Sequence, residues 1–243
     1  MAEQKKRIYL SCPTMHGEEQ RFVQEAFDTN WVAPLGPNVT KFEEEMAAYT
    51  GSGYAAALSA GTAAIHLAIK LLGIKQDDVV FVSSLTFSAT CNPICYEKAK
   101  PVFIDSEPDT WNMDPVALER AFQRYPDVKL VVMAHLYGFP GKMKELKAVC
   151  EKHGALLIED AAESMGASYM GRQTGSYGDY AAISYNGNKI ITGSSGGCLL
   201  TNDQEAANKA RKWSTQAREN APWYQHEEMG YNYRMSNVIA GVV

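Results

Sequence analysis

The sequence predicts an α/β fold with three layers, in which a mainly parallel β-sheet carries helices on both faces. From about residue 54, short apolar runs alternate with longer amphipathic segments along the 243-residue chain. Hydrophobic residues make up 46% of the chain and charged residues 21%, a balance typical of globular proteins with a sizeable core. Strands that alternate with helices favour parallel pairing, with helices packed on both faces of the sheet.

The predicted strands are apolar runs bounded by turn-forming residues. They cover residues 54–58, 79–83, 101–105, 129–135, 155–160, 180–184 and 197–201. The segments between them with helical spacing of apolar residues cover 62–72, 114–125, 142–154 and 204–217. In such sheets a ligand binds beyond the carboxyl ends of the strands, so the loops that follow the strands are the places to search for chemistry.

Residues 40–51 predict one more helix before this core. Thr40 is expected to cap its first turn, with Glu43 completing a capping box and Gly51 ending the helix. The residues before it are expected to form an irregular amino-terminal arm. We predict a single domain over residues 1–243. Because the chain stops within the apolar run MSNVIAGVV, we also expect a carboxy-terminal domain to be missing.

Composition excludes several classes of partner. The chain has 23 basic and 28 acidic residues, and this net charge of -5 argues against nucleic-acid binding and against an anionic membrane surface. No uninterrupted apolar run reaches the roughly 18 residues of a membrane span, and the amino terminus has no signal-peptide core. The five cysteines show no CxxC spacing, so we expect no metal site and a cytoplasmic location.

The first candidate loop follows the strand at 54–58 and reads LSAGTAAIHLA. Its small residues let a ligand approach the backbone, and the unpaired N–H groups of a helix start can bind a phosphate. The strand runs into Ser59, Ala60, Gly61 and Thr62 before a helix begins, and the Thr62 hydroxyl is an added donor. A plain helix cap at Thr62 is the alternative for this loop.

The second and third loops supply an acid and an amine. Glu159 and Asp160 end an apolar strand, where a carboxylate could bind a metal, a ribose or a cationic ring nitrogen, or could cap a helix. The third loop, SYNGNKIITGSSGG, sets Lys189 among uncharged residues, which suits an amine that forms a Schiff base. A solvated loop lysine is the alternative. A phosphate cradle, a strand-end acid and a loop lysine on one sheet are the parts of a pyridoxal phosphate site.

The chain resembles the DegT/DnrJ/EryC1/StrS family, the fold-type-I aminotransferases that act on nucleotide-linked keto sugars. The resemblance is carried in order by WVAPLGPNVTKFEEEMA, LSAGTAAIHLAI, VSSLTFSATCNPI, PVFID, LIEDAAESMGA, SYNGNKIITGSSGG and GYNYRMSN. Within the family the chain is most similar to the transaminases that make the 4-amino sugar precursor of bacillosamine. Residues 1–243 would then be the pyridoxal phosphate-binding large domain.

The resemblance implies a role for each matching residue. Lys189 would carry the cofactor and act as the catalytic acid–base, and Asp160 would keep the pyridine nitrogen protonated. Phe87 would stack on the ring, and Glu163 would lie beside the 3-hydroxyl oxygen, where many relatives have glutamine. The phosphate would bind Gly61, Thr62, Ala63 and Ser184, the last from the family's SxxxxK spacing, and Asn232 would reach the cofactor phosphate of a partner subunit in a homodimer.

The resemblance implies transamination of a UDP-linked 4-keto-6-deoxy-N-acetylhexosamine with L-glutamate as amino donor. A sugar dehydratase of the same fold is one alternative, although histidine replaces the lysine there. A non-catalytic cofactor-binding protein is the other. Outside the motifs, Arg218 and Arg234 could bind a substrate carboxylate or phosphate. His135 could support the site from behind, and the acidic run Glu43–Glu45 is expected to be a solvated helix face.

Overall fold

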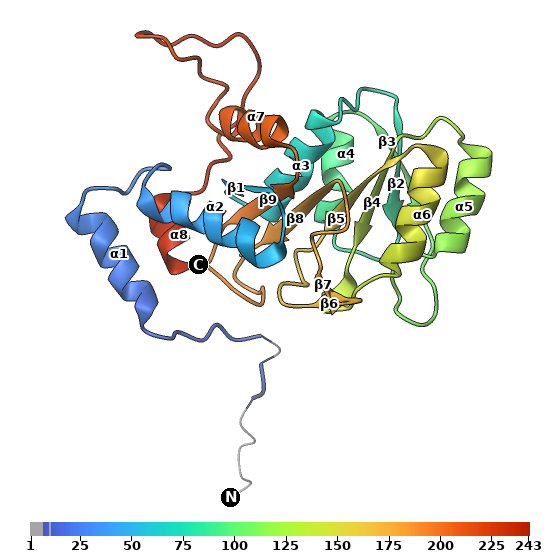
Figure 1. Cartoon of the computed structure of the whole chain (residues 1–243), viewed down its shortest axis with the longest axis horizontal. Coiled ribbons are helices and arrows are strands. Elements are labelled where there is room, and N and C mark those ends of the chain that lie inside the picture. Colours follow the sequence, from blue (N-terminus) through green and yellow to red (C-terminus); the bar gives the residue numbers. More distant parts are fainter. Residues whose placement is uncertain (1–6, 10) are drawn as a thin grey trace, which may run out of the picture.

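The computed structural model describes residues 7–9 and 11–243. Residues 1–6 and residue 10 of the predicted amino-terminal arm lie outside the described residues. The described chain folds around one sheet with helices on both faces (Figure 1). The predicted three-layer α/β architecture is therefore confirmed.

The main sheet has seven strands in the order β1-β9-β8-β5-β4-β2-β3. They are β1 (Tyr54–Leu58), β2 (Val79–Ser83), β3 (Lys100–Ile104), β4 (Leu130–Ala134), β5 (Leu156–Asp160), β8 (Tyr180–Ser184) and β9 (Gly197–Thr201). Only β9 runs antiparallel to its neighbours β1 and β8 in this described sheet, and the other pairs are parallel. The short strands β6 (Ser168–Tyr169) and β7 (Arg172–Gln173) form a separate antiparallel pair.

The helices form the two outer layers. They are α1 (Glu18–Asp28), α2 (Pro37–Thr50), α3 (Gly61–Leu71), α4 (Asn92–Tyr96), α5 (Pro115–Arg124), α6 (Met143–His153), α7 (Gln204–Ser214) and α8 (Asn237–Val242). One apolar core joins α3 and α7 to side chains such as Val82, Val132 and Ile158. On the other face, a second core joins α5 and α6 to alternate strand positions such as Val131. A third core on that face joins α2 and α8 to positions such as Ile183.

Two predictions about the amino-terminal third are wrong. The arm is not irregular throughout, because residues 18–28 form the amphipathic helix α1, which lies beside α8 (Figure 1). Helix α2 begins at Pro37, because proline suits the first helical position, so Thr40 lies inside the helix and does not cap it. The predicted end is correct, since Gly51 adopts the left-handed conformation at φ 72°.

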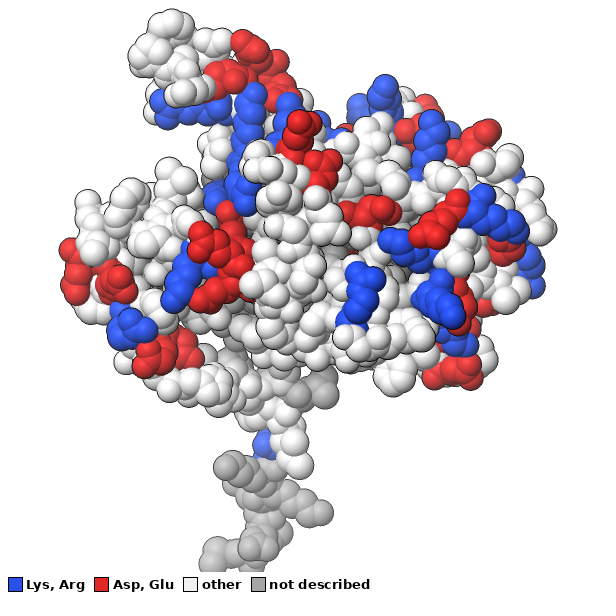
Figure 2. Space-filling view, viewed as in Figure 1, with Lys and Arg blue, Asp and Glu red and all other residues white. Residues whose placement is uncertain are grey.

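Charges of both signs are interspersed over the face shown in Figure 2, with no broad basic field on that face. Glu43, however, is not on the solvated face predicted for it. Its carboxylate is largely buried, accepts a hydrogen bond from the Ala57 N–H and pairs with Arg211 and Arg234. Among the described residues, no helix is both long and apolar enough to span a membrane.

Candidate active site

The carboxyl end of β1 leads into the predicted phosphate loop. The chain passes through Ser59 and Ala60 and enters α3 at Gly61. The first helical hydrogen bond runs from the Ala64 N–H to the Ala60 carbonyl, so the three preceding N–H groups are those that a helix leaves unpaired. Ala60 occupies the cap position and no described side chain caps this helix, so the alternative of a Thr62 cap is wrong.

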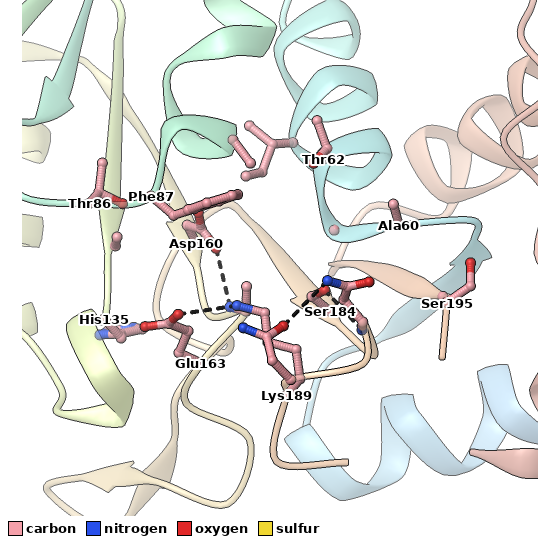
Figure 3. A pocket seen from close by; sticks show the side chains of 18 of the residues that line it. Ala60, Thr62, Thr86, Phe87, His135, Asp160, Glu163, Ser184, Lys189 and Ser195 are labelled. Atoms are coloured by element: carbon pink, nitrogen blue, oxygen red, sulfur yellow. Dashed lines mark hydrogen bonds and ion pairs between the residues drawn. The ribbon is translucent and has the colours of Figure 1, made fainter. Parts of the chain in front are cut away.

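Glycine lets this loop lie close to the neighbouring strand end. A Cβ atom on Gly61 would lie 2.9 Å from the Ser184 Cβ, and one on Gly197 would lie 2.2 Å from the Ala60 carbonyl carbon. A larger side chain at either position would therefore separate the helix start from β8 and β9. The hydroxyls of Thr62 and Ser184 consequently lie near the same helix terminus, at the edge of one cavity (Figure 3).

That cavity has a volume of ≈ 350 Å³, within the range of small-ligand sites. Seven of the nine predicted site residues line it, namely Gly61, Thr62, Phe87, Asp160, Glu163, Ser184 and Lys189. They lie at or shortly after the carboxyl ends of β1, β2, β5 and β8, as expected for a sheet whose strand ends share one edge. The structure thus brings together segments separated by more than a hundred residues.

Lys189 is neither a solvated loop lysine nor isolated from charge. Its side chain is 12% exposed, and its Nζ lies 3.1 Å from Glu163 Oε1. The other oxygen of Glu163 accepts the Tyr137 N–H at 2.9 Å, in a turn where Tyr137 has φ 50°. The absence of charged neighbours expected from the sequence is wrong, because Glu163 is brought to Lys189 by the fold.

Asp160 is buried, with its carboxylate held on two sides. Oδ2 accepts the Thr90 hydroxyl at 2.6 Å, and Oδ1 accepts the Ala162 N–H at 3.1 Å. Burial raises the pKa of Asp160, and these two hydrogen bonds oppose that rise. The residues after Asp160 form turns, so the alternative of a helix cap is wrong.

Glu159 is the neighbouring carboxylate, and its hydrogen bonds hold parts of the fold together. It accepts hydrogen bonds from His135 Nε2 and from the N–H groups of Gly175, Tyr177 and Gly178. Burial alone would raise the pKa of Glu159, but these hydrogen bonds hold it below its usual value. Because Gly141 donates its N–H to Nδ1, His135 carries its proton on Nε2, toward Glu159.

Two predicted residues are absent from the lining of this cavity. The side chain of Ala63 is packed in the core at 4% exposure, so only its backbone is available to a phosphate. Asn232 is exposed and does not line the cavity of its own chain. The side chain of Arg234 is only 8% exposed and pairs with Glu43, so the substrate-binding role considered for it is wrong.

Sequence reasoning missed several residues around the cavity. Ser195 lines it and donates its hydroxyl to the Ser59 carbonyl, closing the phosphate loop against the start of β9. Thr86 lines it and shares a hydrogen bond of 2.7 Å with Thr90, which is fully buried. Thr86 and Thr90 both lie in the segment LTFSAT, of which only Phe87 was selected from the sequence.

These groups fit pyridoxal phosphate by their chemistry. The helix start and two hydroxyls are donors suited to a phosphate, and the buried Asp160 carboxylate lacks a cationic partner within salt-bridge distance among the described residues. Phe87 presents a ring that is 71% exposed at the cavity, and Lys189 supplies an amine. A phosphorylated, cationic aromatic ring that accepts an amine meets all four requirements.

A model of the DegT/DnrJ/EryC1/StrS aminotransferase family matches residues 13–243. The chain belongs to this family. Aminotransferases of the family use pyridoxal phosphate, so the predicted family and its cofactor are confirmed. The similarity to the bacillosamine branch stays a prediction.

The chain is 55% identical over 98% of its length to EpsN of Bacillus subtilis (strain 168), which is provisionally named a pyridoxal phosphate-dependent aminotransferase. It is 40% identical over 97% of its length to the GDP-perosamine synthase of Caulobacter vibrioides. It spans only 62% and 63% of these two relatives. The solved aminotransferase of Psychrobacter cryohalolentis superposes with a TM-score of 0.88 at 32% identity, over 95% of this chain and 61% of that one.

Proposed function

We propose that the full-length protein transfers the amino group of L-glutamate to a nucleotide-linked keto sugar. The observation that supports this most strongly is the common cavity of Lys189, Asp160 and the start of α3. When bound, pyridoxal phosphate supplies an electron sink that weakens the Cα–H bond of the amino donor. The residues 1–243 would act as its cofactor-binding domain.

The roles proposed for the chain's own residues follow from their positions. The Lys189 amine would hold the cofactor and, once released from it, carry a proton from the donor's Cα. Asp160 would accept the ring N–H, and Phe87 would cover the ring face. The N–H groups of Gly61–Ala63, with the Thr62 and Ser184 hydroxyls, would bind the phosphate.

We propose a UDP-linked 4-keto-6-deoxy-N-acetylhexosamine as the amino-group acceptor, with a GDP-linked keto sugar as the second candidate. The first follows from the sequence motifs, and the second from the 40% identity to a GDP-perosamine synthase. We propose a cytoplasmic location for the enzyme, because its five cysteines are free thiols.

We also propose a homodimer in which Asn232 enters the partner's site. The exposure of Asn232 outside its own cavity supports this arrangement. Mixing Lys189→Ala with Asn232→Ala subunits tests it. A shared site restores part of the activity, because one site of each hybrid dimer then keeps both residues. A mixture no more active than its parents would exclude sharing.

The activity is tested by absorbance spectra of full-length protein with pyridoxal phosphate, for wild type and Lys189→Ala. We expect a visible band of lysine-linked cofactor that L-glutamate converts to a pyridoxamine phosphate-like band, and that the variant lacks. Adding UDP-linked or GDP-linked keto sugar should then restore the first band and identify the acceptor. A wild type with the first band but no response to glutamate would favour the non-catalytic alternative. Recovery of a deoxygenated sugar in place of an amino sugar would favour a dehydratase.

A further inference from the structure

A chain of hydroxyl groups leads from the wall of the cavity to the back of the Asp160 carboxylate. Thr86 lines the cavity, and its Oγ1 lies 2.7 Å from the Oγ1 of Thr90. Thr90 is 0% exposed, and its Oγ1 lies 2.6 Å from Asp160 Oδ2. Thr90 belongs to the 3-10 turn Ser88–Thr90, directly after the pocket residue Phe87, and donates its N–H to the Phe87 carbonyl.

The direction of these hydrogen bonds depends on the charge of Asp160. An ionised carboxylate only accepts hydrogen bonds, and a threonine hydroxyl has one hydrogen to donate. Thr90 must therefore donate to Asp160, and Thr86 must donate to Thr90. A separation of 2.6 Å is typical of a charge-assisted O–H···O⁻ bond, which is stronger than a neutral one.

The two bonds also fix the orientation of the carboxylate. Thr90 occupies one oxygen of Asp160 and the Ala162 N–H occupies the other. Each carboxylate oxygen has a second lone pair, and these remain for a donor in the cavity. Lys189, from the loop after β8, and His135, at the end of β4, act electrostatically on Asp160, and Glu163 lines the same cavity.

We infer that Thr90 is a positioning residue of the cofactor site, whose hydroxyl orients the Asp160 carboxylate and keeps it in the acceptor-only form that a cationic ring nitrogen requires. This inference rests on the proposed cofactor-binding role of Asp160. Thr90 itself is too deeply buried to contact the cofactor. Thr86 supports it from the cavity side with a weaker effect, because its hydroxyl is one bond further from the carboxylate.

The test is a titration of cofactor-free full-length protein with pyridoxal phosphate, followed by absorbance. Thr90→Val keeps the shape of the side chain and removes the hydroxyl. We expect it to raise the dissociation constant about tenfold or more, as for loss of a hydrogen bond to a charged group. Thr90→Ser keeps the hydroxyl and should stay within about threefold of wild type, and Thr86→Val should weaken binding about two- to threefold.

Thr174→Val is the matched control for loss of a buried hydroxyl. Thr174 is 2% exposed and donates to the Ser164 carbonyl at 2.7 Å, but it does not line the cavity. We expect this variant to bind pyridoxal phosphate like wild type. Equal weakening by Thr174→Val and Thr90→Val would overturn the inference, because the effect would then reflect general destabilisation.

A pH series separates positioning from packing. Without Thr90, burial of Asp160 is opposed by fewer hydrogen bonds, so its carboxylate should take up a proton at higher pH. The weakening of cofactor binding on acidification should therefore begin at higher pH in Thr90→Val than in wild type or Thr90→Ser. The cofactor's own ionisations are common to all variants and cancel in this comparison.

Two failures remain distinguishable. If wild type binds the cofactor and Thr90→Val binds equally well with the same pH profile, the inference is wrong and the proposed function stands. If wild type forms no cofactor band, the proposed function fails, and the inference fails with it.

Discussion

Glu159 and Asp160 are adjacent carboxylates at the end of β5, yet they have opposite surroundings. Glu159 accepts four hydrogen bonds in a closed environment, from His135 and from three backbone N–H groups. Asp160 accepts two and faces the cavity. Because successive strand residues point to opposite faces, one β-strand directs the Glu159 carboxylate into the scaffold and the Asp160 carboxylate to the cavity.

This difference in surroundings shifts the pKa values of the two carboxylates in opposite directions. The pKa of Glu159 lies below its usual value and that of Asp160 lies above it, although both are buried. The satisfied carboxylate stabilises the native state as an anion. Burial disfavours the anion of Asp160 despite its two hydrogen bonds, and carboxylates with perturbed pKa values in a cavity are typical of functional sites.

The largest effect is expected from Asp160→Asn. This variant removes the negative charge from the cavity and should lower turnover on the order of a hundredfold or more, since a preorganised charge at the reacting ring is lost. Its free energy of unfolding should change by less than about 1 kcal/mol. Steady-state kinetics and urea unfolding measure the two quantities. A large loss of stability with intact turnover would reverse the roles assigned to the two carboxylates.

Glu159→Gln should show the opposite pattern. The glutamine NH₂ group cannot accept the hydrogen bonds that the replaced carboxylate oxygen accepted from N–H groups. The free energy of unfolding should therefore fall by about 3 kcal/mol. Pyridoxal phosphate affinity, measured where the variant is still folded, should stay close to wild type. Asp179→Asn is the control, because the exposed Asp179 accepts the N–H of Leu157, from the same strand as Glu159, and should cost less than about 1 kcal/mol. Equal losses of unfolding free energy in both variants would show that Glu159 stabilises the fold no more than an exposed carboxylate does.

Acid titration of the cofactor-free protein sharpens the comparison. The pKa of Glu159 is lowered in the folded state, so its stabilisation is present above its unfolded value of 4.5 and is lost as the pH falls through the folded value. The stability difference between wild type and Glu159→Gln should therefore shrink below pH 4.5. The pKa of Asp160 is raised above 3.8, so stability relative to Asp160→Asn should fall as the pH rises from 3.8 through the folded value. Urea unfolding across this range gives both differences, and slopes of equal sign would contradict the assignment.

Much of this arrangement could be predicted from the sequence, because it follows from local patterns. The bounds of β1, β8 and β9 agree with the apolar runs at 54–58, 180–184 and 197–201. The cavity residues Gly61, Asp160 and Lys189 could be predicted because loops after parallel strands meet at one edge. In each case a short stretch of sequence carries the whole signal.

Contacts between distant segments could not be predicted in the same way. Thr90 bonds Asp160 across 70 positions, and Glu163 meets Lys189 across 26. Glu43 appeared to be a solvated helix residue, because nothing near it in sequence indicates that Arg234, 191 positions away, would pair with it. Local spacing determines which face of an element a side chain occupies, whereas tertiary packing determines its partner.

The smallest effect is expected at His135, whose ring bonds Glu159 and whose N–H donates to the Asp160 main-chain carbonyl. Its ring donates to Glu159 on the scaffold side, and the residue also lines the cavity. His135→Gln keeps a donor of similar reach but loses the rigid ring, and it should lower the free energy of unfolding by about 1–2 kcal/mol. Cofactor affinity should change less than about threefold, because Asp160 keeps its own bonds to Thr90 and Ala162. The free energy of unfolding and the cofactor affinity should be measured in His135→Gln, in Thr90→Val and in the double variant. Additive effects support separate hydrogen-bond networks around Glu159 and Asp160. Strong coupling would show that the two carboxylates act as one unit.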